Sequence, residues 1–221
     1  MKLEVGVAER PLHGEDRTLV NLDLNLFGVF DGLGGYPGGA EAAEMAARTV
    51  GAYCRGHEPS LTVLAHSVIA ANKAMIAAKA NQELVGYTTA TICWLAPGRL
   101  HWVSVGDSRL YHQPSGGRLM PVSRDEGYRN ILNNCLGDEY EFKGLRQHSS
   151  FVVSHGDKLV LVTDGITGDF KPDLLNPVDL EAAITGRDAQ AAAERLIDVA
   201  RKHDDRSAIV IDIQAESGVE K

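Results

Sequence analysis

Residues 27–47 read FGVFDGLGGYPGGAEAAEMAA, in which an apolar run ends at Asp31 and an alanine-rich segment follows. Five glycines lie within eight residues after Asp31. Glycine loses more backbone entropy on folding than other residues, so such a cluster indicates a tight turn or a close approach of the backbone to a ligand. The stretch is therefore consistent with a loose surface loop, a phosphate-binding loop or a metal-binding corner.

Two nucleotide-binding motifs do not fit this stretch. In a dinucleotide-binding turn that begins Gly32-x-Gly34, the third glycine would fall at Pro37, and no acidic residue near position 52 could bind a ribose. A phosphate-binding P-loop would require Gly-Lys-Ser/Thr after the glycines, and that sequence does not follow.

The composition is ordinary for a globular protein, with 221 residues, 44% hydrophobic and 24% charged. We find neither a linker nor an internal repeat, and we expect one domain over residues 1–221. The formal net charge of −8 argues against a nucleic-acid partner. A phosphate ligand would then have to be attracted by something other than bulk charge, and a bound cation is the simplest candidate.

The cysteines and the N-terminus favour a cytoplasmic protein. Cys54, Cys93 and Cys135 show no metal-ligand spacing, so we expect buried, reduced thiols. The N-terminus lacks the apolar core of a signal peptide, and no run approaches the length of a membrane span, so we expect no membrane partner.

Strands and helices cluster rather than alternate along the chain, which favours an α+β fold over a doubly wound one. The helical patterns lie at about 40–54, 61–79 and 188–203, the last N-capped by Asp188 and closing with basic residues. Residues 2–9 and 207–214 read as strands, residues 17–32 as a pair of strands interrupted by the turn-like DLN, residues 87–123 as an antiparallel meander, and residues 151–166 as a strand pair around SHGD.

Carboxylates recur at predicted strand ends. Asp31 and Asp164 each precede a glycine after an apolar run, Asp205 stands before the final strand, and Glu15 and Asp16 lie beside the first strands. A single aspartate at such a position is usually a turn residue. Several together would repel each other at one sheet edge unless cations lie between them. Oxygen ligands without cysteine or histidine favour Mg²⁺ or Mn²⁺, and two such ions could activate water and clamp a phosphoryl group.

Taken in order, GEDR, VFDGLGG, GYTTAT, VGDSRLY, SRDEG, VTDGI and DDRSAIV resemble the signature series of metal-dependent type 2C (PPM) Ser/Thr protein phosphatases, in a compact bacterial style. The series runs from about residue 5 to 213. The resemblance implies an α-β-β-α sandwich of two antiparallel sheets flanked by helices, with a binuclear metal centre at one end. The flap subdomain of bacterial members is largely absent, because only residues 128–132 join SRDEG to NNCLGD.

The resemblance also assigns roles to residues. It implies that Asp31 bridges two metal ions, that the Gly32 carbonyl helps bind one, and that Asp164 and Asp205 hold the other. It further implies that Glu15 and Asp16 act mainly through metal-bound waters. Asp107 would bind a third, weaker ion together with Asp164.

The chain departs from the family pattern at several positions. The arginine that grips the substrate phosphate is replaced by Pro11, so we assign that contact to the neighbouring Arg10. The acidic residue expected four positions after Asp164 is Gly168, with Asp169 one step later, which puts the third ion in doubt. An asparagine of the last motif is replaced by Arg206, which could contact phosphate or point to solvent.

The resulting hypothesis is a Mg/Mn-dependent phosphatase that hydrolyses phosphoserine or phosphothreonine by direct attack of a metal-bridging water. Its partner would be a phosphorylated protein from a Ser/Thr kinase pathway. Two alternatives stay open: a catalytically weak pseudophosphatase acting as a regulatory binding module, and a metal-dependent phosphatase of small metabolites.

Overall fold

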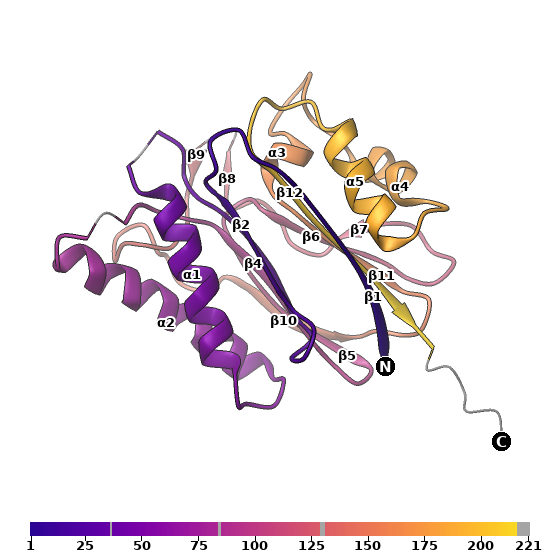
Figure 1. Ribbon diagram of the computed structural model, residues 1–221, viewed down its shortest axis with the longest axis horizontal. Coiled ribbons are helices and arrows are strands. Elements are labelled where there is room, and N and C mark those ends of the chain that lie inside the picture. The colour runs from indigo at the N-terminus through magenta and orange to yellow at the C-terminus, as the bar shows by residue number, and fades with distance from the viewer. Residues whose placement is uncertain (36, 84, 129–130, 216–221) are drawn as a thin grey trace.

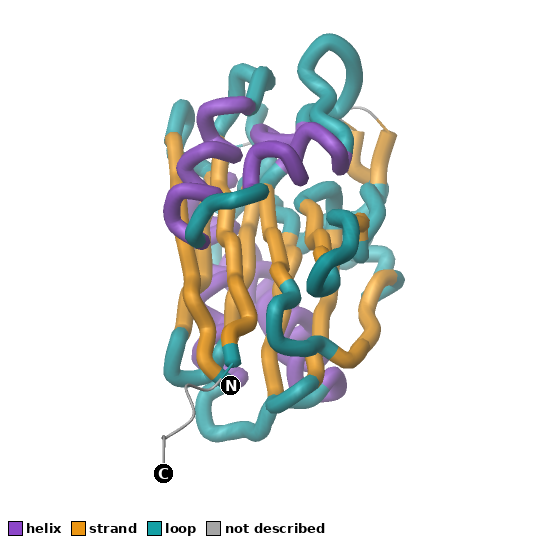
Figure 2. Tube along the Cα trace, turned by 90° about the vertical axis from the view of Figure 1, so that its right-hand side faces the viewer, coloured by secondary structure: helices purple, strands orange, loops and turns teal. Residues whose placement is uncertain are grey.

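The computed structural model describes residues 1–35, 37–83, 85–128 and 131–215. Two five-stranded antiparallel sheets lie face to face, and helices cover both outer surfaces (Figure 1). Figure 2 shows that the strands of both sheets run in roughly the same direction, with connecting loops gathered at the two ends. The α-β-β-α sandwich expected from the sequence is confirmed.

The first sheet joins strands that are far apart in the chain. Its order is β1 (Lys2–Arg10), β12 (Arg206–Gln214), β11 (Lys158–Val162), β6 (Arg109–Gln113) and β7 (Met120–Pro121). Helices α4 (Pro177–Ile184) and α5 (Ala189–Val199) cover its outer face, and the short α3 (Asp164–Thr167) follows β11 directly.

The second sheet has the order β10 (Gln147–Val152), β5 (Arg99–Val105), β4 (Ala90–Ala96), β3 (Leu26–Asp31) and β2 (Asp16–Asn21). Helices α1 (Gly39–Cys54) and α2 (Leu61–Ala80) pack on its outer face. Ser60 begins α2 as an N-cap, accepting a hydrogen bond from the Val63 amide.

Apolar side chains fill three layers: one between α1–α2 and the second sheet, one between the sheets, and one beneath α4–α5. Strand β3 is buried on both faces, with Phe27 and Val29 toward the other sheet and Leu26 and Phe30 toward the helices. This explains why its sequence is apolar throughout rather than alternating.

The predicted meander over 87–123 is wrong in one connection. Strands β4 and β5 form a hairpin, but β6 pairs with β11 in the other sheet. The change of sheet occurs at Gly106 (φ 100°), and the Ser108 carbonyl accepts a hydrogen bond from the Thr91 hydroxyl at 2.8 Å. Turn composition predicts that the chain reverses, but it carries no information about which strand becomes the neighbour.

The predicted strand pair over 151–166 is wrong for the same reason, since β10 pairs with β5 and β11 pairs with β6 and β12. The connection between them is fixed by Asp157, whose carboxylate accepts from the Ser154 and Ser115 amides at 3.0 and 2.9 Å.

Helix α5 begins after Asp188, which accepts from the Ala191 amide at 2.7 Å as expected, but it ends at Val199. The basic residues predicted for its last turn lie in the loop beyond it. Helix α4 was not predicted, although Asn176 and Asp179 form a capping box around Pro177.

By length and composition alone, α2 could cross a membrane, so the expectation that no run approaches a span is corrected. In the structure, one face of α2 packs against α1 and the second sheet through Leu64, Val68 and Met75. This packing buries 39% of the most apolar 18-residue window of the helix.

Between the SRDEG and NNCLGD motifs the structure describes two short strands, β8 (Gly127–Tyr128) and β9 (Ile131–Leu132), paired as a hairpin. Residues 129–130 lie outside the described residues. In the described residues, no larger subdomain stands at this position.

The contact between α5 and the first sheet depends on a missing side chain at Gly6. A Cβ atom there would lie 2.0 Å from the Ala189 carbonyl oxygen at the start of α5. We expect Gly6→Ala to lower the free energy of unfolding by about 2–3 kcal/mol, because the helix must move away. Gly51→Ala in α1 is the matched control, since its Cβ would meet only Leu19 at 3.4 Å, and it should be neutral or up to about 1 kcal/mol stabilising. Urea denaturation of both variants checks this, and equal stabilities would contradict it.

Candidate metal centre

Loops from both sheets meet at one end of the sandwich around a cavity of about 570 Å³. Six of the sequence-predicted residues line it: Glu15, Asp31, Gly32, Asp107, Asp164 and Asp205. They come from the ends of β3, β5 and β11 and from the segments before β2 and β12. The structure therefore brings together side chains that are up to 190 positions apart in the chain.

Asp31 is held by its backbone. Its amide donates to the Thr89 hydroxyl at 3.0 Å, and its carbonyl accepts from the Thr88 hydroxyl at 2.9 Å and the Thr89 amide at 2.8 Å. Both threonines are buried immediately before β4. They fix the end of β3 and leave the Asp31 carboxylate directed into the cavity.

The glycines after Asp31 are explained by close approach of backbone to backbone. A Cβ atom at Gly32 would lie 2.4 Å from the Gly39 carbonyl oxygen, and one at Gly39 would lie 2.9 Å from the Glu15 carboxylate. Gly38 has φ 88° and lies against the Gly86 amide. The cluster thus folds the start of α1 onto Asp31 and Glu15.

Asp205 lies in a cradle of backbone amides. Its carboxylate accepts from His13 at 2.6 Å, from Glu15 at 2.5 Å, and from Leu12. Burial alone would raise the pKa of Asp205, but these amide hydrogen bonds outweigh it and lower the pKa to about 2. The segment 11–15 is therefore wrapped around a carboxylate that stays ionised.

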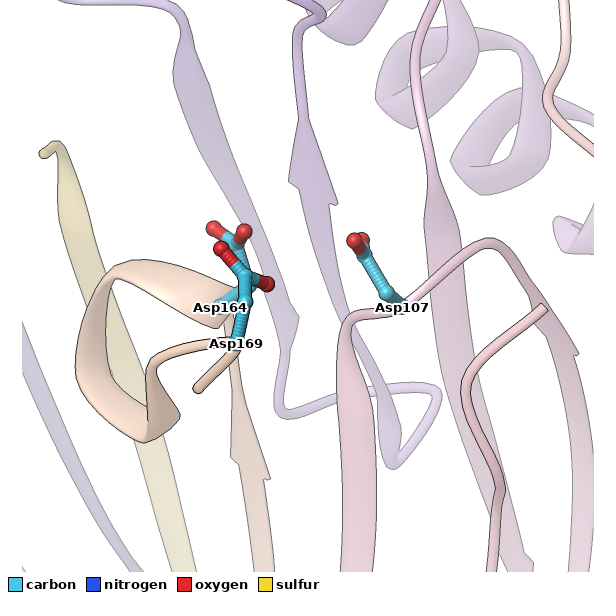
Figure 3. A group of neighbouring side chains, drawn as sticks. All are labelled: Asp107, Asp164 and Asp169. Carbon is cyan, nitrogen blue, oxygen red and sulfur yellow. The ribbon is translucent and has the colours of Figure 1, made fainter. Parts of the chain in front are cut away.

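Asp107, Asp164 and Asp169 form a compact group, in which each offers an oxygen within 4.8 Å of the others. Figure 3 shows Asp164 and Asp169 side by side at α3 and the loop after it, with Asp107 facing them from the turn after β5. Asp169 stands one position later in the chain than the family pattern expects. It still joins this group, because the chain after α3 turns back at Gly168 (φ 66°).

The pKa values of Asp31 and Asp107 are raised because these side chains are buried close to other carboxylates. Burial first, and then the nearby carboxylates of Asp16, Asp164 and Asp107, hold the pKa of Asp31 well above its usual value. Burial followed by Asp164 and Asp169 does the same for the pKa of Asp107. Ionised together in the absence of cations, these groups destabilise the fold.

Asp16 stands behind the cavity and does not line it. Its Oδ2 accepts from the Thr163 hydroxyl at 2.8 Å, while its buried Oδ1 has no hydrogen-bond partner among the described residues. Burial, partly offset by hydroxyl hydrogen bonds, raises the pKa of Asp16 to about 7. A buried carboxylate oxygen without a partner is costly unless it binds water or a cation.

These observations fit divalent metal ions. The donors are carboxylate oxygens and one backbone carbonyl, the set that Mg²⁺ and Mn²⁺ prefer. Asp31, Gly32, Asp164 and Asp205 would hold them, with Glu15 and Asp16 in support and Asp107 beside Asp164.

Two arginines considered from sequence do not reach the cavity. Arg10 pairs with Asp198 at 2.8 Å on the surface, and both side chains are about half exposed. Arg206 donates to the carbonyls of Lys202 at 2.7 Å and Ile197 at 3.2 Å. Assigning the phosphate contact to Arg10 therefore finds no support in the geometry, because β1 directs its side chain toward α5.

Sequence reasoning missed Lys202 entirely. Its ammonium group contacts Asp164 and lies 3.1 Å from Asp169 Oδ2 and 3.0 Å from Asp204 Oδ2. His13, His203 and Asp204 also line the cavity. The signal was present in the run KHDD at residues 202–205, where four charged or titratable residues precede a strand.

Comparison with known proteins places this geometry among phosphatases. Residues 12–199 match the sequence model of the family described as Protein phosphatase 2C. No curated protein matches the chain.

Solved structures share the fold over nearly the whole chain. The serine/threonine phosphatase PstP/Ppp of Mycobacterium tuberculosis is 23% identical with a TM-score of 0.79, covering 96% of this chain and 99% of that one. A catalytic domain of PstP in complex with two manganese ions is 20% identical with a TM-score of 0.78, covering 97% and 100%. Stp1 of Staphylococcus aureus is 18% identical with a TM-score of 0.80, covering 97% and 96%.

The raised pKa of Asp31 predicts that its ionisation lowers the free energy of unfolding of the metal-free protein in a pH-dependent way. The penalty is absent below the unfolded pKa of about 4 and grows as pH rises toward the higher folded value, because ionisation is costlier in the folded state. In EDTA, we expect Asp31→Asn to melt several degrees above wild type at pH 8 and at the same temperature near pH 4. Circular dichroism melts across this range check it; a lower melting temperature for Asp31→Asn at pH 8 would contradict it. Added Mn²⁺ should raise the wild-type value far more than that of the variant.

Proposed function

Because the chain belongs to the protein phosphatase 2C family of metal-dependent Ser/Thr phosphatases, we propose that its acidic cavity binds Mg²⁺ or Mn²⁺ and hydrolyses phosphoserine and phosphothreonine in proteins. The observation that carries the proposal is the convergence of Asp31, Asp164 and Asp205 on one cavity from three separate strand ends.

The residues of the chain prepare this cavity for divalent ions. The carboxylates of Asp31, Asp164 and Asp205 and the carbonyl of Gly32 would bind two ions, and Glu15 would orient water at the cavity wall. When bound, such ions lower the pKa of a coordinated water and neutralise charge on a phosphoryl group. Asp205 is already ionised by its amide cradle, so metal binding there displaces no proton at neutral pH.

The cavity supports attack by water rather than by a protein nucleophile. Cys135 lines it, but burial and then the charge of Glu141 raise the pKa of its thiol to about 12. A thiol of that pKa is protonated at neutral pH and is a poor nucleophile. Cysteine-based phosphoryl transfer is therefore disfavoured, and direct hydrolysis at the metal centre remains.

The net charge of −8 is compatible with an anionic substrate only if the ions supply the local positive charge. We infer that the partner is a cytoplasmic phosphoprotein modified by a Ser/Thr kinase. A phosphorylated metabolite is the second substrate class to assay.

Hydrolysis of a phosphothreonine peptide should require Mn²⁺ or Mg²⁺ and should fall at least about 100-fold in Asp164→Asn, because a ligand position is lost. Asp198→Asn is the matched control, since Asp198 is about half exposed and pairs with Arg10 outside the cavity. Phosphate release with and without EDTA is the measurement. If wild-type protein binds Mn²⁺ but releases no phosphate from the peptide, the result would favour a pseudophosphatase. If it also hydrolyses small phosphate esters, the result would favour a metabolite phosphatase.

The position of Arg10 yields a separate expectation. Arg10→Ala should change KM for the phosphopeptide by less than about twofold, because it removes only an exposed ion pair. An arginine that bound the phosphate would instead contribute charge-assisted hydrogen bonds, and its loss would raise KM about tenfold or more. Steady-state kinetics distinguish these two roles of Arg10, and a large rise in KM would indicate that Arg10 binds the substrate phosphate.

A further inference from the structure

Lys202 lies in the loop between α5 and β12, and its side chain is one-fifth exposed. Its ammonium group contacts three carboxylates at once: Asp164, Asp169 Oδ2 at 3.1 Å and Asp204 Oδ2 at 3.0 Å. Among the described residues that line the cavity, Lys202 is the one lysine or arginine. A positive charge of the chain itself therefore lies inside the acidic group.

The loop that carries Lys202 is fixed from the protein side. Arg206 donates one guanidinium hydrogen bond to the Lys202 carbonyl at 2.7 Å and a second to the Ile197 carbonyl at 3.2 Å. The amide of Asp205 donates to Asp204 Oδ1 at 2.9 Å, which leaves the other Asp204 oxygen for Lys202. Because these contacts hold the backbone, only the rotamer freedom of the Lys202 side chain is lost when the ammonium group is placed among the carboxylates.

Lys202 and a divalent ion would compete for the same carboxylate groups. Asp107, Asp164 and Asp169 offer oxygens within 4.8 Å of one another, a spacing that one cation could span (Figure 3). Lys202 already contacts the carboxylates of Asp164 and Asp169. An ion placed among these three carboxylates would lie within a few ångströms of the ammonium group and would be repelled by it.

We propose that Lys202 is a tethered cation that takes the place of a divalent ion at the Asp107–Asp164–Asp169 group and keeps this outer position closed to metal. This inference rests on the proposed metal centre. It makes Asp169 a positioning residue for Lys202 rather than a metal ligand. It also leaves the inner oxygens of Asp31, Gly32, Asp164 and Asp205 as the places where ions bind.

The test counts Mn²⁺ ions in protein stripped with EDTA, using isothermal titration and the electron paramagnetic resonance signal of free Mn²⁺. Lys202→Met keeps the apolar stem and removes the charge. We expect it to bind one more Mn²⁺ than wild type, or to bind its weakest ion about tenfold more tightly. Lys202→Arg should match wild type. Arg10→Met, which removes another ion-paired cation outside the cavity, is the control and should also match wild type.

A second variant keeps the test independent of how well Lys202→Met folds without metal. Asp169→Asn leaves Lys202 in place. We expect this variant to bind as many Mn²⁺ ions as wild type, because Asp169 contacts the Lys202 ammonium group rather than a metal ion. Loss of one ion in Asp169→Asn, or unchanged binding in Lys202→Met, would overturn the inference while leaving the metal centre intact. Wild-type protein that binds no Mn²⁺ would overturn both.

Discussion

Mutual repulsion among carboxylates at one end of the sandwich is the constraint on which the rest of the site depends. Asp16, Asp31, Asp107 and Asp164 are packed where water cannot screen them well. Such a group costs free energy in the folded state unless positive charge or hydrogen-bond donors offset it. The structure offers backbone amides to Asp205, a hydroxyl to Asp16 and the ammonium group of Lys202 to Asp164.

The carboxylates are stabilised to different extents by these donors, and this difference decides which of them need a bound cation. Asp205 is satisfied by the protein and stays ionised, whereas Asp31 and Asp107 have raised pKa values and Asp16 has an oxygen without a partner among the described residues. The groups left short of positive charge face the cavity or lie just behind it. Divalent ions satisfy several such oxygens at once, which is why the arrangement favours them over scattered monovalent contacts.

The fold tolerates the repulsion among these carboxylates because apolar packing elsewhere in the structure stabilises it. Three apolar layers hold the two five-stranded sheets and the helices on their outer faces together. A Cβ atom at Gly32 or Gly165 would meet the backbone of Gly39 or Asp205, and one at Gly39 would meet the Glu15 carboxylate, so these glycines let the segments that carry the acidic residues pack closely. The same packed core therefore holds Asp31 and Asp107 in place although their ionisation in metal-free protein lowers the free energy of unfolding.

The sequence by itself determined the elements and the residue types of the site. Apolar runs, glycines and capping residues predicted β3, α1, α2 and the start of α5, and the ordered acidic motifs indicated the family, because both signals are local in the chain. Only the tertiary structure decided which strands are neighbours, since pairing of β6 with β11 and β10 with β5 is settled by burial across the sandwich. It likewise placed Asp169 and Lys202 in the acidic group and took Arg10 out of it. A side chain's direction depends on the packing of distant segments, and no local pattern records that packing.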